Sequence, residues 1–194
     1  MRLIVLMLLY LLSAEFIFSE VAEHKANIQV QKIEQRYHFL VKTQLNANAN
    51  TLFDLLTDYN NINKLDKSIL SSRIISEKGA LIRVETISYD CIGPFCQQLK
   101  HTQDVQSFNN KVIVAKTIPQ QSDYRFGYMQ WYIQPIINNS QLEQSLITLT
   151  IELEPDFWLP PIVGDYFFKQ KFSSSLQLFF INLEKMAIAK DNKK

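Results

Sequence analysis

Apolar side chains near the C-terminal end of the chain follow the period of an α-helix. Within residues 155–187 they recur at i, i+4, i+7, i+8, i+11 and i+14. These positions are Phe172, Leu176, Phe179, Phe180, Leu183 and Met186. The spacing places them on one helical face, and Pro160 and Pro161 suit the first turn, where amide protons lack intrahelical partners. We therefore predict one long, strongly apolar helix.

The preceding segments alternate between apolar and polar positions, which is typical of half-buried strands. The clearest segment is 144–154, where apolar residues alternate with Thr148, Thr150 and Glu152. Turn sequences around Gly79 and at residues 109–110 predict hairpins between neighbouring segments. The predicted extended segments are 27–45, 72–77, 81–91, 96–108, 111–118, 128–134 and 144–154.

A short helix is predicted after the first extended segment. Residues 51–59 place Leu52, Leu55 and Leu56 on one face, and Asn50 is expected to cap the helix N-terminus. The order is then strand, helix, about six antiparallel strands and a long helix, which fits a curved antiparallel sheet wrapped around the last helix. The expected fold class is α+β.

The N-terminus has the pattern of a targeting segment. Arg2 supplies a positive start, and an unbroken run of ten apolar residues follows at 3–12. This run is shorter than the roughly 20 residues that span a bilayer. We expect residues 1–19 to be a signal peptide, with an uncleaved anchor or a buried strand as alternatives. Residues 25–190 then form one periplasmic domain, or one held at the inner membrane by the retained anchor.

The two cysteines, Cys91 and Cys96, bracket a turn sequence that contains Gly93 and Pro94. Strand-like residues flank the turn, so we expect the thiols to meet across a hairpin and form a structural disulfide. A redox-active pair is the weaker interpretation, because that chemistry uses two intervening residues and here there are four. A disulfide is consistent with export.

Composition narrows the classes of partner. The net charge is +1, and nucleic-acid binding would need a concentrated basic face, so no nucleic-acid partner is expected. The glycines are only Gly79, Gly93, Gly127 and Gly164, and their spacing excludes a glycine-rich phosphate loop. No Cys/His cluster indicates a metal, and no cofactor is predicted.

Two stretches resemble a known superfamily. Residues 46–75 read NANANTLFDLLTDYNNINKLDKSILSSRII, and residues 155–164 read PDFWLPPIVG, with NLEKMA at 182–187. These phrases are similar to those of the START-like (SRPBCC) superfamily, and to its polyketide cyclase/dehydrase and coenzyme-Q-binding-like branch. The resemblance covers roughly residues 28–187. The leader and the cysteine hairpin suggest an exported bacterial member.

The resemblance implies a helix-grip fold with a cavity between the sheet and the last helix. Members bind sterols, lipids, quinones, polyketides or plant hormones there, and a few catalyse cyclisation or dehydration. No catalytic residue carries over, because the superfamily has no shared catalytic signature. The residues expected to line the cavity are Trp131, Ile133, Leu149, Ile151, Phe172, Leu176, Phe179 and Leu183.

Three functional hypotheses follow. The first is binding or transport of a hydrophobic small molecule (a lipid, quinone or polyketide-like compound) without catalysis. The second is a cyclase/dehydrase-like enzyme, which needs a histidine such as His101, or a carboxylate, inside the cavity. The third is a periplasmic interaction module that uses an exposed apolar patch. We expect a monomer, and contact with a membrane surface is left open.

Overall fold

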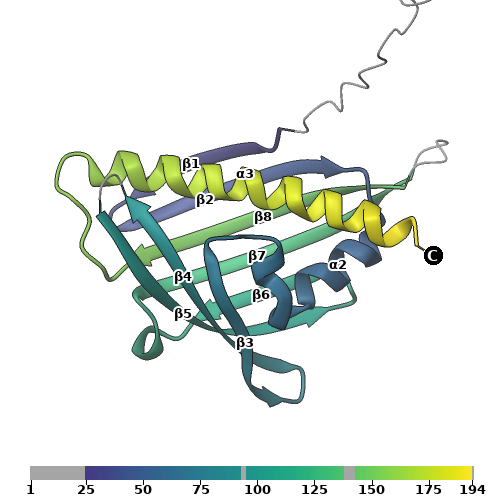
Figure 1. Ribbon diagram of the computed structural model, residues 1–194, viewed down its shortest axis with the longest axis horizontal. Coiled ribbons are helices and arrows are strands. Elements are labelled where there is room, and N and C mark those ends of the chain that lie inside the picture. The colour runs from purple at the N-terminus through teal and green to yellow at the C-terminus, as the bar shows by residue number, and fades with distance from the viewer. Residues whose placement is uncertain (1–24, 93–94, 138–142, 194) are drawn as a thin grey trace, which may run out of the picture.

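The structure is a computed structural model that describes residues 25–92, 95–137 and 143–193. Its antiparallel sheet curves around one long helix, α3 (Gly164–Asp191), which lies across the concave side (Figure 1). The sheet has eight strands in the order β1-β2-β8-β7-β6-β5-β4-β3. This arrangement confirms the predicted α+β helix-grip fold.

Most strands are long and joined by hairpins. They are β1 (Asn27–Ile33), β2 (Arg36–Leu45), β3 (Ile69–Lys78), β4 (Leu81–Ile92), β5 (Phe95–Phe108), β6 (Val112–Thr117), β7 (Tyr124–Ile136) and β8 (Gln144–Pro155). The shorter helical elements are α2 (Ala49–Thr57), η1 (Tyr59–Lys64) and η2 (Pro119–Gln121). Among the described strands, only the β2–β8 pairing joins strands that are not consecutive in the chain, and it adds the β1–β2 hairpin to the sheet beside β8.

The first extended segment is a hairpin, whereas the sequence predicted a continuous strand over 27–45. β1 and β2 pair antiparallel, with Ile33 opposite Arg36. The turn depends on Glu34, whose φ is 55°. A glutamate in this left-handed region is uncommon, which is why no turn was predicted at this position.

Both helices start at positions that differ from the predictions. Helix α2 begins at Ala49, and the cap is Asn48, whose side-chain oxygen accepts a hydrogen bond from the Asn50 amide at 2.7 Å. Helix α3 begins only at Gly164, so Pro160 and Pro161 precede it. Ile162, at φ 74°, interrupts the helical backbone between these prolines and Gly164.

The apolar face of α3 divides into two parts. Its most buried large side chains, Phe168, Phe180 and Leu183, pack into the core. Phe172 and Phe179 lie on the same face but are only partly buried. Phe172 and Phe179 border space under the helix that the sheet does not fill, and the buried Phe168 side chain borders the same space.

The predicted disulfide is confirmed. Cys91 and Cys96 are directly opposite in the β4–β5 ladder and are joined by an S–S bond of 2.00 Å. The turn residues 93–94 and the expected signal peptide, residues 1–19, lie outside the described residues. Within the described residues, no helix is both long and apolar enough to cross a membrane.

Candidate ligand-binding cavity

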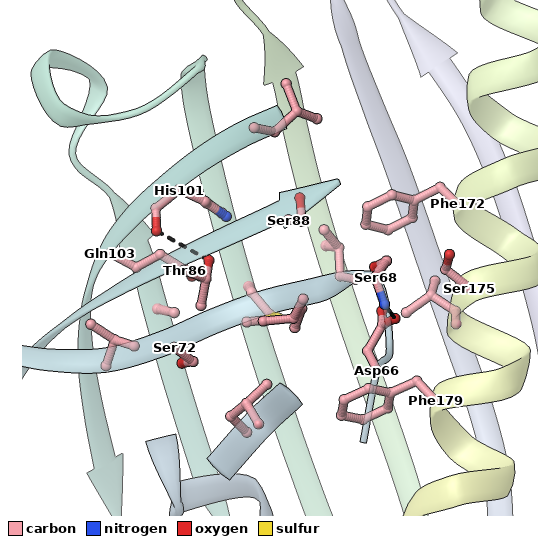
Figure 2. A pocket seen from close by; sticks show the side chains of 18 of the residues that line it. Asp66, Ser68, Ser72, Thr86, Ser88, His101, Gln103, Phe172, Ser175 and Phe179 are labelled. Carbon is pink, nitrogen blue, oxygen red and sulfur yellow. Dashed lines mark hydrogen bonds between the residues drawn. The ribbon is translucent and has the colours of Figure 1, made fainter. Parts of the chain in front are cut away.

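A cavity of about 280 Å³ lies between α3 and the concave face of the sheet. Its lining comes from α3, from the segment that includes α2 and η1, and from strands β3 to β8. Figure 2 shows Phe172, Ser175 and Phe179 on the helix facing side chains that rise from the sheet. The volume is near the lower end of the range for small-molecule sites, about 300 to 1,000 Å³.

One part of the lining is apolar. Six of the eight residues expected to line the cavity do so: Trp131, Leu149, Ile151, Phe172, Leu176 and Phe179. The Trp131 ring lies 5.8 Å from the Phe179 ring, measured between centroids. These residues offer a ligand aromatic and aliphatic contact area with no charge.

The structure places Ile133 and Leu183 elsewhere. Both are fully buried, at 0% exposure, and neither is part of the cavity lining. Ile133 lies two residues beyond Trp131 on β7, the strand that contacts α2. The side chains are close-packed there, so these two residues belong to the filled core.

A second part of the lining is polar, and the sequence reasoning missed most of it. Four side chains on adjacent strands face the cavity: Thr86 and Ser88 on β4, and His101 and Gln103 on β5 (Figure 2). They share the inner faces of their strands with apolar residues such as Val84, Leu99 and Val105, which also line the cavity. We call these four residues the polar wall.

His101 is held within this wall by its neighbours. Its Nε2 atom lies 2.6 Å from Thr117 Oγ1, and its ring centroid is 4.7 Å from that of Tyr124. Burial lowers the pKa of His101 to about 4, because the cationic form loses hydration. The imidazole is therefore neutral at pH 7.

Gly127 makes room for the Thr117–His101 contact. A Cβ atom at Gly127 would lie 1.9 Å from Thr117 Oγ1, far inside contact distance. Glycine on β7 is thus needed for the hydroxyl on β6 to reach the histidine on β5. Three neighbouring strands together set the orientation of the imidazole.

Two buried tyrosines also line the cavity. Tyr124 is 8% exposed and Tyr59 is 7% exposed. Burial raises the pKa of Tyr59 to about 12, and burial, with Asp90 and Asp123 nearby, raises that of Tyr124 further. Both phenols therefore stay protonated at physiological pH.

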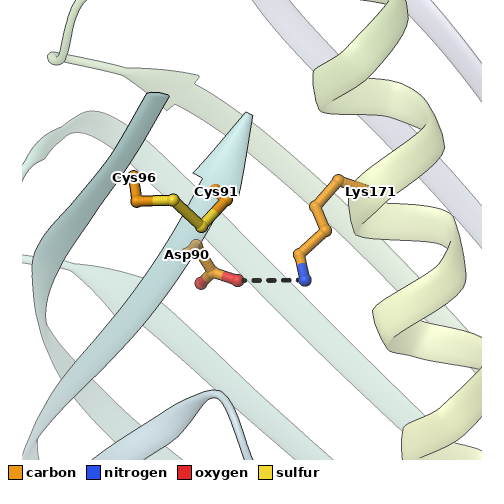
Figure 3. Close-up of a disulfide and its surroundings, with 4 residues drawn as sticks. All are labelled: Asp90, Cys91, Cys96 and Lys171. Atoms are coloured by element: carbon orange, nitrogen blue, oxygen red, sulfur yellow. Dashed lines mark ion pairs between the residues drawn. A yellow bond between two sulfur atoms is a disulfide. The ribbon is translucent and has the colours of Figure 1, made fainter. Parts of the chain in front are cut away.

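Two contacts connect α3 to the β3–β4 side of the sheet. Lys171 Nζ lies 3.6 Å from Asp90 Oδ1, beside the disulfide (Figure 3). Farther along α3, the Asn182 amide donates to the carbonyl oxygen of Leu65 at 3.0 Å. Lys171 is exposed and still lines the cavity, so it marks the rim. Ser175 lines the cavity between these two contacts.

Metal-ligand clusters are absent from the described residues. No group of three or more His, Cys, Asp or Glu side chains there is placed to hold an ion.

Comparisons with known proteins identify the fold. No protein-family model matches the sequence, and no curated protein does. Among solved structures, a START superfamily protein from Mycobacterium smegmatis is similar, with a TM-score of 0.61 and 14% identity over 78% of this chain and 97% of that one. The Zhui aromatase/cyclase from Streptomyces sp. R1128 has a TM-score of 0.61 and 11% identity over 78% and 93%.

A third similar structure is the di-domain ARO/CYC BexL from the BE-7585A biosynthetic pathway. It has a TM-score of 0.56 and 11% identity, and the match covers 80% of this chain and 51% of that one. Identities this low establish architecture and not activity. The curved eight-stranded sheet, the long C-terminal helix and these matches together show that the chain has the START-like (SRPBCC) helix-grip fold.

Proposed function

We propose that this protein binds or carries a hydrophobic small molecule in the cavity under α3, without catalysing a reaction on it. The observation that carries the proposal is the unfilled space beside Phe172 and Phe179, in a core that is otherwise close-packed. Apolar side chains around such a space favour a lipid, quinone or polyketide-like guest. Each methylene transferred from water into it contributes about 0.8 kcal/mol.

The chemistry of the cavity argues for binding over catalysis. A general base is most effective when its pKa is near the working pH, and the pKa of His101 is lowered to about 4 by burial. The Asp90 carboxylate lies in an ion pair with Lys171. A histidine with so low a pKa is a weak general base at pH 7.

A cyclase/dehydrase-like enzyme is the second candidate. It is favoured by a specific observation: His101 lines the cavity and contacts Tyr124, so the cavity is not wholly apolar. Two of the similar structures are aromatase/cyclases by name. The third hypothesis, an interaction module with a filled core, is less consistent with the cavity.

A matched pair of serine variants tests the binding proposal. Ser175 lines the cavity, whereas Ser174 is exposed on the same helix and does not line it. We expect the purified chain to bind the neutral fluorophore N-phenyl-1-naphthylamine, and Ser175→Phe to weaken this binding at least about tenfold by occupying the space. Ser174→Phe should leave it unchanged.

Two results would contradict the binding proposal, and a third would favour the enzymatic alternative. A folded parent protein that binds no fluorophore, and that native mass spectrometry shows to be empty after purification from cells, would contradict the proposal. Equal effects of the two serine variants would also contradict it. Turnover of a polyketide-like substrate that is lost in His101→Gln would favour the enzymatic alternative.

We further propose that the protein is exported to the periplasm. The apolar run at residues 3–12 and the Cys91–Cys96 disulfide support this location. Cell fractionation with thiol alkylation is the test. A protein that stays in the cytoplasm with both thiols reduced would refute it.

A further inference from the structure

Several polar groups inside the cavity have no hydrogen-bond partner among the described residues. The Tyr124 hydroxyl, the Gln103 amide and the Ser88 hydroxyl make no hydrogen bond to any other described residue, although all three residues line the cavity. Tyr124 is more than nine-tenths buried. The Tyr124 hydroxyl oxygen is itself accessible, since Thr43 Oγ1 is the one fully buried side-chain polar atom without a partner among the described residues. The phenol therefore reaches the open space of the cavity, where it is available to a guest.

The other polar groups of the wall are already engaged. Thr86 Oγ1 donates to the carbonyl oxygen of His101 at 3.2 Å, and His101 Nε2 contacts Thr117. The groups of the polar wall left for a guest are therefore the Gln103 amide and the Ser88 hydroxyl, and the Tyr124 phenol lies next to the wall at His101. All three are uncharged, and all can pair with a hydroxyl or carbonyl oxygen.

Charge at the cavity does not favour an anion. The charged residues in the lining are Asp66, Asp90 and Lys171. Lys171 is paired with Asp90, and Asp66 adds a further carboxylate near the rim. An ionised carboxylate or phosphate placed against the polar wall would find no free cation there, and burying such a charge unpaired is strongly unfavourable.

We propose that the guest is a neutral amphipathic molecule whose hydroxyl or carbonyl oxygen is bound by Tyr124, beside the polar wall, while its apolar part lies against Phe172 and Phe179. This inference rests on the proposed binding function and adds an orientation and a charge selection to it. Figure 2 shows the basis for the orientation: Gln103 and Ser88 lie on the sheet, and both phenylalanines lie across from them on α3.

Three probes with one isoprenoid chain test the charge selection. Farnesol, farnesoic acid and farnesylamine differ only in the terminal group and can each displace N-phenyl-1-naphthylamine. At pH 7.5 we expect farnesol to bind about tenfold or more tightly than the ionised acid, because the carboxylate must lose its hydration without gaining a cation. Farnesylamine should also bind more weakly than farnesol.

An isosteric substitution tests the anchor. Tyr124→Phe removes only the unpartnered hydroxyl, so the fold should be retained. Farnesol affinity should fall about five- to tenfold, the value of one hydrogen bond of ordinary strength, and by more than the affinity for the fluorophore falls. Tyr132→Phe is the matched control, because Tyr132 is an exposed residue of the same strand and does not line the cavity.

Each of the other possible results contradicts a specific part of the proposal. If the fluorophore binds but the acid or the amine binds as tightly as farnesol, the charge selection is wrong. If Tyr124→Phe leaves farnesol affinity unchanged, the Tyr124 hydroxyl does not bind the guest, and the proposed hydrogen bond is wrong. If Tyr59→Phe weakens farnesol and Tyr124→Phe does not, the orientation is reversed. Loss of fluorophore binding in the parent protein contradicts the binding function itself.

Discussion

The contact between Gly127 and Thr117 offers the sharpest test of how the fold builds the cavity. In the Gly127→Ala variant the new methyl group would lie 1.9 Å from Thr117 Oγ1, 3.0 Å from Thr117 Cβ and 3.4 Å from Leu153 Cδ2. The Thr117 hydroxyl must rotate away, and doing so breaks its 2.6 Å contact with His101. The perturbation is therefore a steric clash coupled to a lost hydrogen bond.

The magnitude follows from three contributions. Overpacking costs about 1 to 3 kcal/mol, and the lost hydrogen bond costs about 1 kcal/mol. Alanine also restricts the unfolded chain more than glycine does, which offsets about 0.5 kcal/mol of this loss of stability. We expect the free energy of unfolding to fall by about 1.5 to 3.5 kcal/mol, which lowers Tm by about 2 to 4 °C for each kcal/mol in a domain of this size.

A double-mutant cycle identifies the cause. Thr117→Ala removes the atom that the new methyl group meets, so on this background Gly127→Ala should cost at most about 1 kcal/mol. Urea unfolding of the four proteins gives the coupling directly. A Tm for Gly127→Ala within about 1 °C of the parent protein would refute the reasoning, as would two substitutions whose effects simply add.

The remaining predictions concern the core, the histidine and the disulfide. Leu183→Ala, at a fully buried position, should lower the free energy of unfolding by about 2 to 5 kcal/mol. Leu178→Ala, on the exposed face of the same helix, should change it by less than about 0.5 kcal/mol. Thermal unfolding of the two variants tests this difference. Because the folded pKa of His101, about 4, is below its ordinary value of 6.5, the unfolded chain binds this proton first, and stability should fall as the pH drops from 6.5 toward 4. His101→Gln should flatten that part of the pH profile in urea titrations, and an unchanged profile would contradict the burial of the imidazole. Replacing Cys91 and Cys96 by serine removes the covalent restraint on the unfolded chain and should lower the free energy of unfolding by about 2 kcal/mol. An equal Tm with and without the disulfide would contradict this prediction.

Local patterns in the sequence account for the elements and their order. The helical stripe around Leu176 and the alternation in residues 144–154 each depend on the period of one element, and that period can be read from neighbouring residues. The disulfide was predictable for the same reason, since Cys91 and Cys96 flank a short turn. The hairpin at Glu34 was not, because it relies on a left-handed residue that carries no glycine or asparagine signal.

The cavity was decided by the tertiary structure alone. Phe179 and Phe180 are consecutive in sequence and equally apolar, yet Phe180 is 1% exposed in the core and Phe179 borders the cavity. Likewise, Gln103 lies on the inner face of β5 with Leu99 and Val105, and only the tertiary structure shows that this face borders a cavity there. Sequence by itself determined which faces are apolar and in what order the elements occur. How far the curved sheet stands from α3 depends on the packing of residues distant in the chain, and that spacing determines whether an apolar side chain fills the core or leaves room for a guest.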